Sequence, residues 1–145
     1  MLHSSLLYLS EAAHAVDEAF LKKLASHAEE KNKRINITGY LYYCKGVYLQ
    51  YLEGDKTAIT NLFQVIDADT RHNVKNVVEM STDGVALFPD WSMRYVSDHE
   101  IREVGIEALI ENSMRAIGVG ESFSEEESGK LIRRLCEAMS KIYTK

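Results

Sequence analysis

The chain has 145 residues, of which 46% are hydrophobic and 27% are charged, a composition that suits one domain with a core of its own. Its net charge is −5 and its Lys and Arg residues are scattered, which argues against nucleic acid as a partner because phosphate recognition needs concentrated positive charge. Its apolar runs are only a few residues long, far below the roughly 20 residues of a membrane span, so no membrane association is expected.

The first part of the chain predicts a strand followed by a helix. The apolar run around Tyr8, at residues 6–9, favours a buried strand. Apolar side chains then recur at helical spacing over residues 20–28, and Asp17 is a candidate N-cap for that helix. The helix is expected to end in the polar segment 29–33.

The middle of the chain predicts a hairpin, a second helix and two more strands. The second helix has an apolar face over residues 59–66 and starts at Asp55 or Thr57. A Lys45-Gly46 pair separates the first two of these strands, which favours a tight hairpin. The strands predicted here are residues 35–43, 47–52, 74–80 and 91–96.

The resulting order, βαββαββ, is that of an α+β, ferredoxin-like sandwich with two helices crossing over a mixed sheet. Right-handed crossovers place both helices on one face of the sheet. In the third strand, residues 47–52, largely apolar side chains point to both faces. The second face is therefore expected to be covered too, by the C-terminal segment or by another subunit of a homo-oligomer.

The chain changes character near its last third, which divides it into a domain of residues 1–97 and a helical extension of residues 98–145. Apolar residues spaced over 106–117 predict one helix in this extension. Ser124 and Glu127 form a capping-box pattern that predicts the start of a second. These two helices are expected to cover the free face of the sheet.

Three polar residues stand out in apolar or junctional surroundings. Gln50 lies in an apolar strand, where a primary amide is costly unless its donor and acceptor are both satisfied. Tyr8 lies within a Leu-rich strand, and Asn32 lies near the end of the first helix, where Asn is a common C-cap. By residue chemistry alone, the three suit a small ligand with its own donors and acceptors, and they equally suit a polar patch with no function.

Motifs in the sequence favour the first of these two possibilities, a bound ligand. Residues 32–54 read NKRINITGYLYYCKGVYLQYLEG, with an Asn, an Ile-Thr-Gly turn into a strand, a hairpin and a Gln-x-Leu-Glu-Gly end. Further motifs are Leu7-Tyr8-Leu9-Ser10, Asp69-Thr70-Arg71-His72 and Phe88-Pro89-Asp90-Trp91-Ser92-Met93. In this order the motifs resemble the pattern of BLUF domains, blue-light sensors that use FAD, over about residues 1–97. The resemblance implies the same ferredoxin-like fold.

The resemblance implies non-covalent binding of FAD. Asn32 is expected to hydrogen-bond the pyrimidine edge of the isoalloxazine, and Gln50 to lie between the flavin N5/O4 edge and the Tyr8 hydroxyl. Arg71 is expected at the polar side of the flavin, with His72 assisting. The full set of cofactor-binding side chains that we expect is Tyr8, Leu24, Lys31, Asn32, Gln50, Ile66, Arg71 and His72.

The same resemblance implies a light signal that starts with electron and proton transfer from Tyr8 to the flavin and rearranges Gln50. Trp91 and Met93, expected to share one face of the last strand, are candidates to relay the change to the C-terminal helices. Those helices would then alter contacts with a downstream protein partner. The chain is thus expected to be a short, stand-alone sensor and not an enzyme.

Two other functions fit the fold class. One is a flavin-free, dimerising ferredoxin-like interaction domain. The other is a small hydrolase of acylphosphatase type, which is disfavoured because residues 10–14 contain neither Gly nor Arg to hold a phosphate. Cys44 and Cys136 predict neither a disulfide framework nor, with His, a metal site, so a reducing, cytoplasmic setting is expected.

Overall fold

The structure is a computed structural model that describes residues 3–82, 91–120 and 122–143. A first set of elements is β1 (His3–Ala12), α1 (Glu18–Arg34), β2 (Thr38–Cys44), β3 (Val47–Asp55), α2 (Lys56–Asp67), β4 (His72–Thr82) and β5 (Arg94–Val96). Three helices follow, namely α3 (Asp98–Val104), α4 (Glu107–Gly118) and α5 (Glu125–Tyr143).

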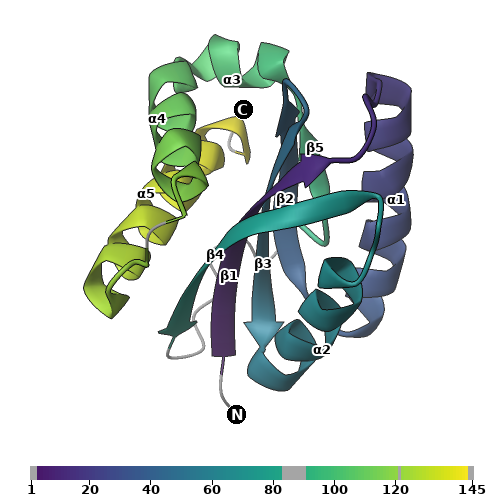
Figure 1. The fold of residues 1–145 in the computed structure, drawn as a ribbon, viewed down its shortest axis with the longest axis vertical. Coiled ribbons are helices and arrows are strands. Elements are labelled where there is room, and N and C mark those ends of the chain that lie inside the picture. Colours follow the sequence, from purple (N-terminus) through teal and green to yellow (C-terminus); the bar gives the residue numbers. More distant parts are fainter. Residues whose placement is uncertain (1–2, 83–90, 121, 144–145) are drawn as a thin grey trace.

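One five-stranded sheet runs through the middle of the molecule in the order β4-β1-β3-β2-β5 (Figure 1). Its pairs are antiparallel except for β2 with β5, which are parallel. Helices α1 and α2 lie on one face, and α4 and α5 lie on the other (Figure 1). The predicted α+β, ferredoxin-like fold with both sheet faces covered by helices is therefore confirmed.

Local signals in the sequence account for the start of several elements. Asp17 accepts a hydrogen bond from the backbone N–H of Phe20 at 2.8 Å and caps α1. Asp55 caps α2 in the same way, from Ala58 at 3.2 Å. Gly46 has a φ of 84° in the turn between β2 and β3, a backbone shape that glycine adopts without steric cost.

The C-terminal region contains one helix more than the sequence predicts. The additional helix, α3, has only seven residues and too short an apolar pattern to be recognised. A capping box between Ser97 and Glu100 starts it, and Gly105, with a φ of 73°, ends it. Strand β5 is also shorter than predicted, because it begins at Arg94 and not at Trp91.

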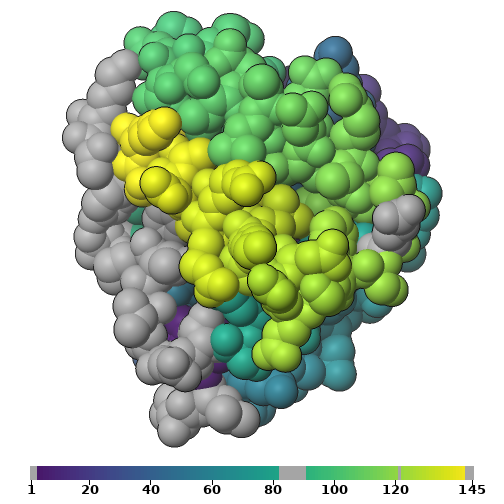
Figure 2. Space-filling view, turned by 90° about the vertical axis from the view of Figure 1, so that its left-hand side faces the viewer, coloured from purple at the N-terminus to yellow at the C-terminus, as the bar shows by residue number. Residues whose placement is uncertain are grey.

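Two separate hydrophobic cores lie on the two sides of the sheet. One core joins alternate strand residues such as Leu7 and Leu49 to the buried face of α4 and α5. The other joins the intervening strand residues, such as Leu6 and Leu52, to α1 and α2. Figure 2 shows α4 and α5, in light green and yellow, on the outer surface of this side of the molecule.

No helix in the described ranges is long and apolar enough to cross a membrane. Cys44 and Cys136 are both free thiols.

Candidate functional site

A cleft of about 270 Å³ opens between α1 and α2, with strands β1 and β3 as its floor. Its walls are far apart in the sequence, because they come from both helices, four strands and the segment between α2 and β4. All eight side chains predicted to bind a cofactor line this cleft, namely Tyr8, Leu24, Lys31, Asn32, Gln50, Ile66, Arg71 and His72.

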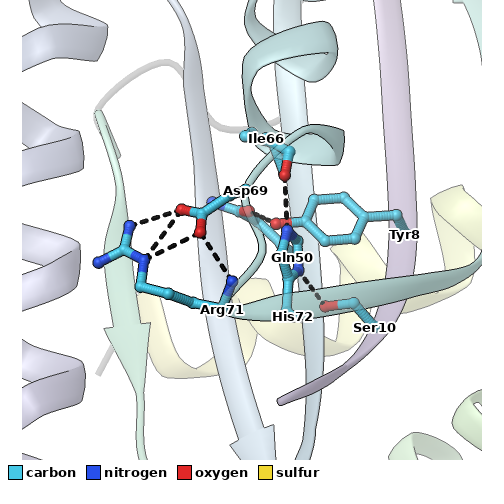
Figure 3. Close-up of polar contacts among 7 residues, drawn as sticks. All are labelled: Tyr8, Ser10, Gln50, Ile66, Asp69, Arg71 and His72. Carbon is cyan, nitrogen blue, oxygen red and sulfur yellow. Dashed lines mark hydrogen bonds and ion pairs between the residues drawn. The ribbon is translucent and has the colours of Figure 1, made fainter. Parts of the chain in front are cut away.

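A chain of hydrogen bonds crosses the floor of the cleft. Tyr8 on β1 lies opposite Gln50 on β3 in the strand register, and the Tyr8 hydroxyl donates to Gln50 Oε1 (Figure 3). Gln50 Nε2 donates in turn to the Met93 sulfur at 3.4 Å. A thioether is a weak acceptor, so this amide N–H keeps most of its capacity for a stronger partner.

The state of the Tyr8 phenol follows from its burial. Loss of solvent around the ring raises the pKa of Tyr8 well above its usual value, and the neighbouring Tyr48 and Asp69 raise this pKa further. Tyr8 therefore stays protonated and acts as a hydrogen-bond donor toward Gln50. The Gln50 amide matches this arrangement, with its oxygen toward Tyr8 and its nitrogen toward Met93.

Asn32 lies in the last turn of α1 with only 2% of its surface exposed. Its side-chain Nδ2 donates to the backbone carbonyl of Ser92 at 3.1 Å and ties α1 to the segment before β5. The alternative in which Asn32 is the C-cap of the helix is wrong, because the C-cap is Ile35. The Asn32 side chain is instead buried and lines the cleft.

His72 is fixed from both ring nitrogens (Figure 3). Its Nε2 lies 2.6 Å from the carbonyl oxygen of Ile66, and its Nδ1 lies 2.8 Å from Ser10 Oγ. A carbonyl can only accept, so Nε2 carries the proton, and in the neutral ring Nδ1 accepts from the Ser10 hydroxyl. The imidazole therefore joins the end of α2 to β1 and stands edge-on to the Tyr8 ring, with centroids 6.1 Å apart.

Arg71 is held at the rim of the cleft by Asp69 (Figure 3). Its Nη2 lies 2.6 Å from Asp69 Oδ2, and its Nε and backbone N–H both donate to the same carboxylate. These hydrogen bonds from Arg71 lower the pKa of Asp69 to about 2. The Arg71 side chain is 66% exposed, so its guanidinium can also contact a polar group at the mouth of the cleft.

Sequence reasoning missed several side chains of the cleft. Two of them, Phe20 on α1 and Val65 on α2, are large apolar residues with 36% and 70% of their surface exposed. Exposed apolar walls above a polar floor fit a flat heteroaromatic ring with a hydrogen-bonding edge. The sequence could have revealed Phe20 through its helical spacing and Asp69 through its place in the Asp-Thr-Arg-His motif. No sequence pattern marks Val65 as a lining residue. Lining residues outside the predicted set include Phe20, His27, Ala28, Leu41, Tyr48, Leu52, Leu62, Val65 and Asp69.

The expectation that Trp91 and Met93 share one face of a strand is wrong. Trp91 packs in the core beneath α4 and α5, whereas Met93 packs in the core on the cleft side with Tyr8. Both residues precede β5, which starts at Arg94, so strand alternation does not apply to them. Of the motif that contains them, residues 88–90 lie outside the described ranges.

Trp91 is held through both its backbone and its side chain. Its carbonyl accepts from the N–H of Gly39 at 2.7 Å, and the Arg94 guanidinium lies 4.8 Å from the centre of its ring. Arg94 also forms an ion pair with Glu100, the residue whose carboxylate completes the cap of α3. The segment around Met93 is thus connected to the first of the C-terminal helices.

These features define an α+β domain with a cleft that suits a small, flat and partly polar molecule. Within the described residues, no group of three His, Cys, Asp or Glu side chains could hold a metal ion. The BLUF family model, described as sensors of blue-light using FAD, matches residues 3–94. The chain therefore belongs to the BLUF family of flavin-using blue-light photoreceptors.

Curated relatives match this chain over part of its length. The chain is 32% identical over 91 residues to the photoactivated adenylate cyclase subunit beta of Euglena longa, a match that covers 62% of this chain and 11% of that protein. It is 40% identical over 74 residues to the subunit alpha of Euglena gracilis, covering 51% of this chain and 7% of the relative. The matched region is thus a small part of these relatives.

Solved structures show the same fold. The dark-state structure of BlrB, a BLUF protein, is 29% identical with a TM-score of 0.68, and the match covers 96% of this chain and 97% of BlrB. Klebsiella pneumoniae BlrP1 with FMN and cyclic diGMP is also 29% identical, with a TM-score of 0.59, over 78% of this chain and 30% of BlrP1. The similarity to BlrB extends through the C-terminal helices.

Proposed function

We propose that this chain binds FAD non-covalently in the cleft between α1 and α2 and that blue light acts through Tyr8 and Gln50. The contact of the Tyr8 hydroxyl with the Gln50 amide at the floor of the cleft carries the proposal. Bound flavin would supply the light absorption and the one-electron chemistry, and the protein would supply position and electrostatics. The choice of FAD over FMN follows the family description.

Tyr8 is the electron and proton donor in this proposal. A phenol can lose an electron and then its proton, and the Tyr8 proton already points at Gln50 Oε1. A primary amide has a donor at one end and an acceptor at the other. Rotation of the Gln50 amide, or transfer of its proton to give the imidic tautomer, reverses the pattern that it offers to the ligand. The weak hydrogen bond to Met93 lowers the cost of that change.

Other cleft residues would hold the ring. Asn32 is proposed to hydrogen-bond the pyrimidine edge, while Arg71 holds the polar side and His72 supports the floor. Lys31 would add a cation at the edge of the cleft. Leu24 and Ile66 are proposed to sandwich the ring between the two helices.

The signal is proposed to leave the cleft through Met93. A change at Gln50 alters its contact with the Met93 sulfur, and the next residue, Arg94, is ion-paired to Glu100 on α3. Trp91, which packs beneath α4 and α5 and under the Arg94 guanidinium, is the second proposed relay residue. Residues 1–97 would then form the sensor, and residues 98–145 would be the helical extension that carries the signal.

The proposed output is a change in protein contacts and not catalysis. The C-terminal helices would bind a downstream protein partner, or another copy of the chain in a homo-oligomer, differently in darkness and in light. The two free cysteines fit the reducing, cytoplasmic location that we propose. Nucleic acid is not proposed as a partner, because the net charge is −5.

The test starts with the purified protein, which should be yellow, release FAD on denaturation, and shift its absorption to the red under blue light. Gln50→Leu should retain flavin and lose the shift. Tyr8→Phe should also retain flavin and fail to form the shifted state. Leu52→Val, another cleft residue, is a matched control that should keep the shift. A colourless protein that takes up no added FAD would favour the flavin-free interaction domain instead.

A further inference from the structure

A second phenol lines the cleft beside Tyr8. Tyr48 lies on β3 two residues before Gln50, points to the same face of the sheet and is 8% exposed. Its ring stands edge-on to His72 at a centroid distance of 6.3 Å, and the Tyr8 ring lies 6.1 Å from the same imidazole. His72 therefore lies between two phenols that face one site.

The two phenols differ in how they are connected. The Tyr8 hydroxyl donates to Gln50, so a change in the charge or protonation of Tyr8 directly alters the hydrogen bond to the amide. In the described part of the chain, the side-chain hydrogen bonds of Gln50 go to Tyr8 and Met93, and none goes to Tyr48. Oxidation of Tyr48 would therefore leave the Tyr8–Gln50 hydrogen bond in place.

We propose that Tyr48 is a second electron donor to photoexcited flavin, which competes with Tyr8 and produces no signal. This rests on the proposed function, in which flavin occupies the cleft. Tyr48 gives one electron to the flavin and its phenolic proton to water at the mouth of the cleft. The electron then returns to the Tyr48 radical, which takes a proton back from water, so no atom or electron is gained or lost in the cycle.

The other aromatic residues are placed less well for this role. Trp91 packs in the core on the opposite side of the sheet, beneath α4 and α5. Phe63, whose ring lies 5.6 Å from that of Tyr8, is a much poorer electron donor than a phenol. Tyr43 contacts Tyr48 at a centroid distance of 5.0 Å but does not line the cleft. Tyr48 is thus the second oxidisable ring in the cleft, and its competition would set the fraction of absorbed photons that switch Gln50.

The experiment compares the emission lifetime of bound flavin in four variants of the full chain. In Tyr8→Phe, the red shift should be lost while the emission stays largely quenched. In the double variant Tyr8→Phe, Tyr48→Phe, the lifetime should become several-fold longer. Tyr48→Phe alone should keep the red shift and reach it with fewer photons. Tyr43→Phe is the matched control and should leave both lifetime and photon yield unchanged.

A second measurement identifies the oxidised residue. Illumination of frozen Tyr8→Phe protein should give the electron paramagnetic resonance signal of a tyrosyl radical, and the double variant should lose it. The proposal is wrong if Tyr8→Phe alone restores the full lifetime, or if Tyr8→Phe, Trp91→Phe restores it and the double tyrosine variant does not. Flavin content and the melting temperature of each flavin-free variant show that the fold is retained. Failure of the proposed function gives a different result: the wild type would bind no flavin or show no red shift. Failure of the Tyr48 proposal would leave both of these wild-type properties intact.

Discussion

The two faces of the sheet are built from the same strands and yet serve different purposes. Toward α4 and α5, alternate residues such as Leu7 and Leu49 are completely buried in a filled core. Toward α1 and α2, their neighbours Tyr8 and Gln50 form the floor of a cleft. One-residue alternation along β1 and β3 is enough to give the sheet a filled side and a cleft side.

Both faces contain buried polar side chains, and the difference lies in their partners. On the filled side, the Tyr51 hydroxyl lies 2.9 Å from Ser5 Oγ and 3.2 Å from the buried Glu53 carboxylate, so strong partners come from the protein itself. On the cleft side, the amide nitrogen of Gln50 has the weak acceptor Met93 Sδ. Buried polar groups cost stability unless they are paired, so a ligand that pairs with Gln50 also stabilises this face.

The largest effect on the free energy of unfolding should come from a cavity in the core between the sheet and helices α4 and α5. Leu135→Ala removes a fully buried side chain of α5 and should lower the free energy of unfolding by about 2–5 kcal/mol. Leu24→Ala, in the half-buried wall of the cleft, should cost less without flavin and should mainly weaken flavin binding. Urea denaturation of flavin-free protein and titration with FAD measure the two effects. Equal losses of stability would show that the two faces are packed alike.

Asn32 is the strongest candidate for a residue that serves both fold and ligand. Asn32→Ala removes the hydrogen bond to the Ser92 carbonyl and should lower the free energy of unfolding by about 1–3 kcal/mol. Flavin affinity should fall as well, as measured by equilibrium titration. The control is Asn61→Ala on the exposed surface of α2, which should change neither quantity. Unchanged flavin affinity in Asn32→Ala would remove the residue from the proposed site.

The proposed route from Met93, on the cleft side, to helix α3 can be weakened at Arg94. Arg94→Gln breaks the ion pair with Glu100 and the contact with the Trp91 ring, at a cost in dark stability of about 1 kcal/mol or less. The red shift should remain, because Gln50 is untouched. Light-induced changes in hydrogen exchange of the α3 amides should shrink. Arg102→Gln, in the last turn of the same helix, is the control, and an undiminished response in Arg94→Gln would rule out this route.

The smallest effect concerns pH at the rim of the cleft. The pKa of Asp69 is lowered from 3.8 to about 2 by Arg71, so folding favours the ionised carboxylate. Its contribution to stability is complete above about pH 4 and is lost as the pH falls through about 2. Since Arg71 is largely exposed, this contribution should stay below about 1 kcal/mol. Asp69→Asn should therefore be less stable than wild type near neutral pH, and this difference should shrink as the pH falls through about 2, as measured by urea denaturation; a constant difference would contradict this.

The sequence by itself determined the elements and most of their starting points. The caps at Asp17 and Asp55 each need one side chain and a backbone N–H three residues later, and the turn at Gly46 needs only glycine's backbone freedom. Local sequence therefore reveals them. The family resemblance also led to the eight residues that we predict to bind a cofactor, and all of them line one cleft. Local patterns were weakest for the seven-residue α3, where they carry little signal.

Only the tertiary structure decided which side chains meet and on which face. Tyr8 and Gln50 are 42 residues apart in the chain, and the β1–β3 register alone puts the hydroxyl on the amide. Trp91 and Met93, two residues apart, lie on opposite sides of the sheet because the strand begins after them. Periodicity holds only inside a regular element, and contacts between distant elements follow from packing of the complete sheet and its helices.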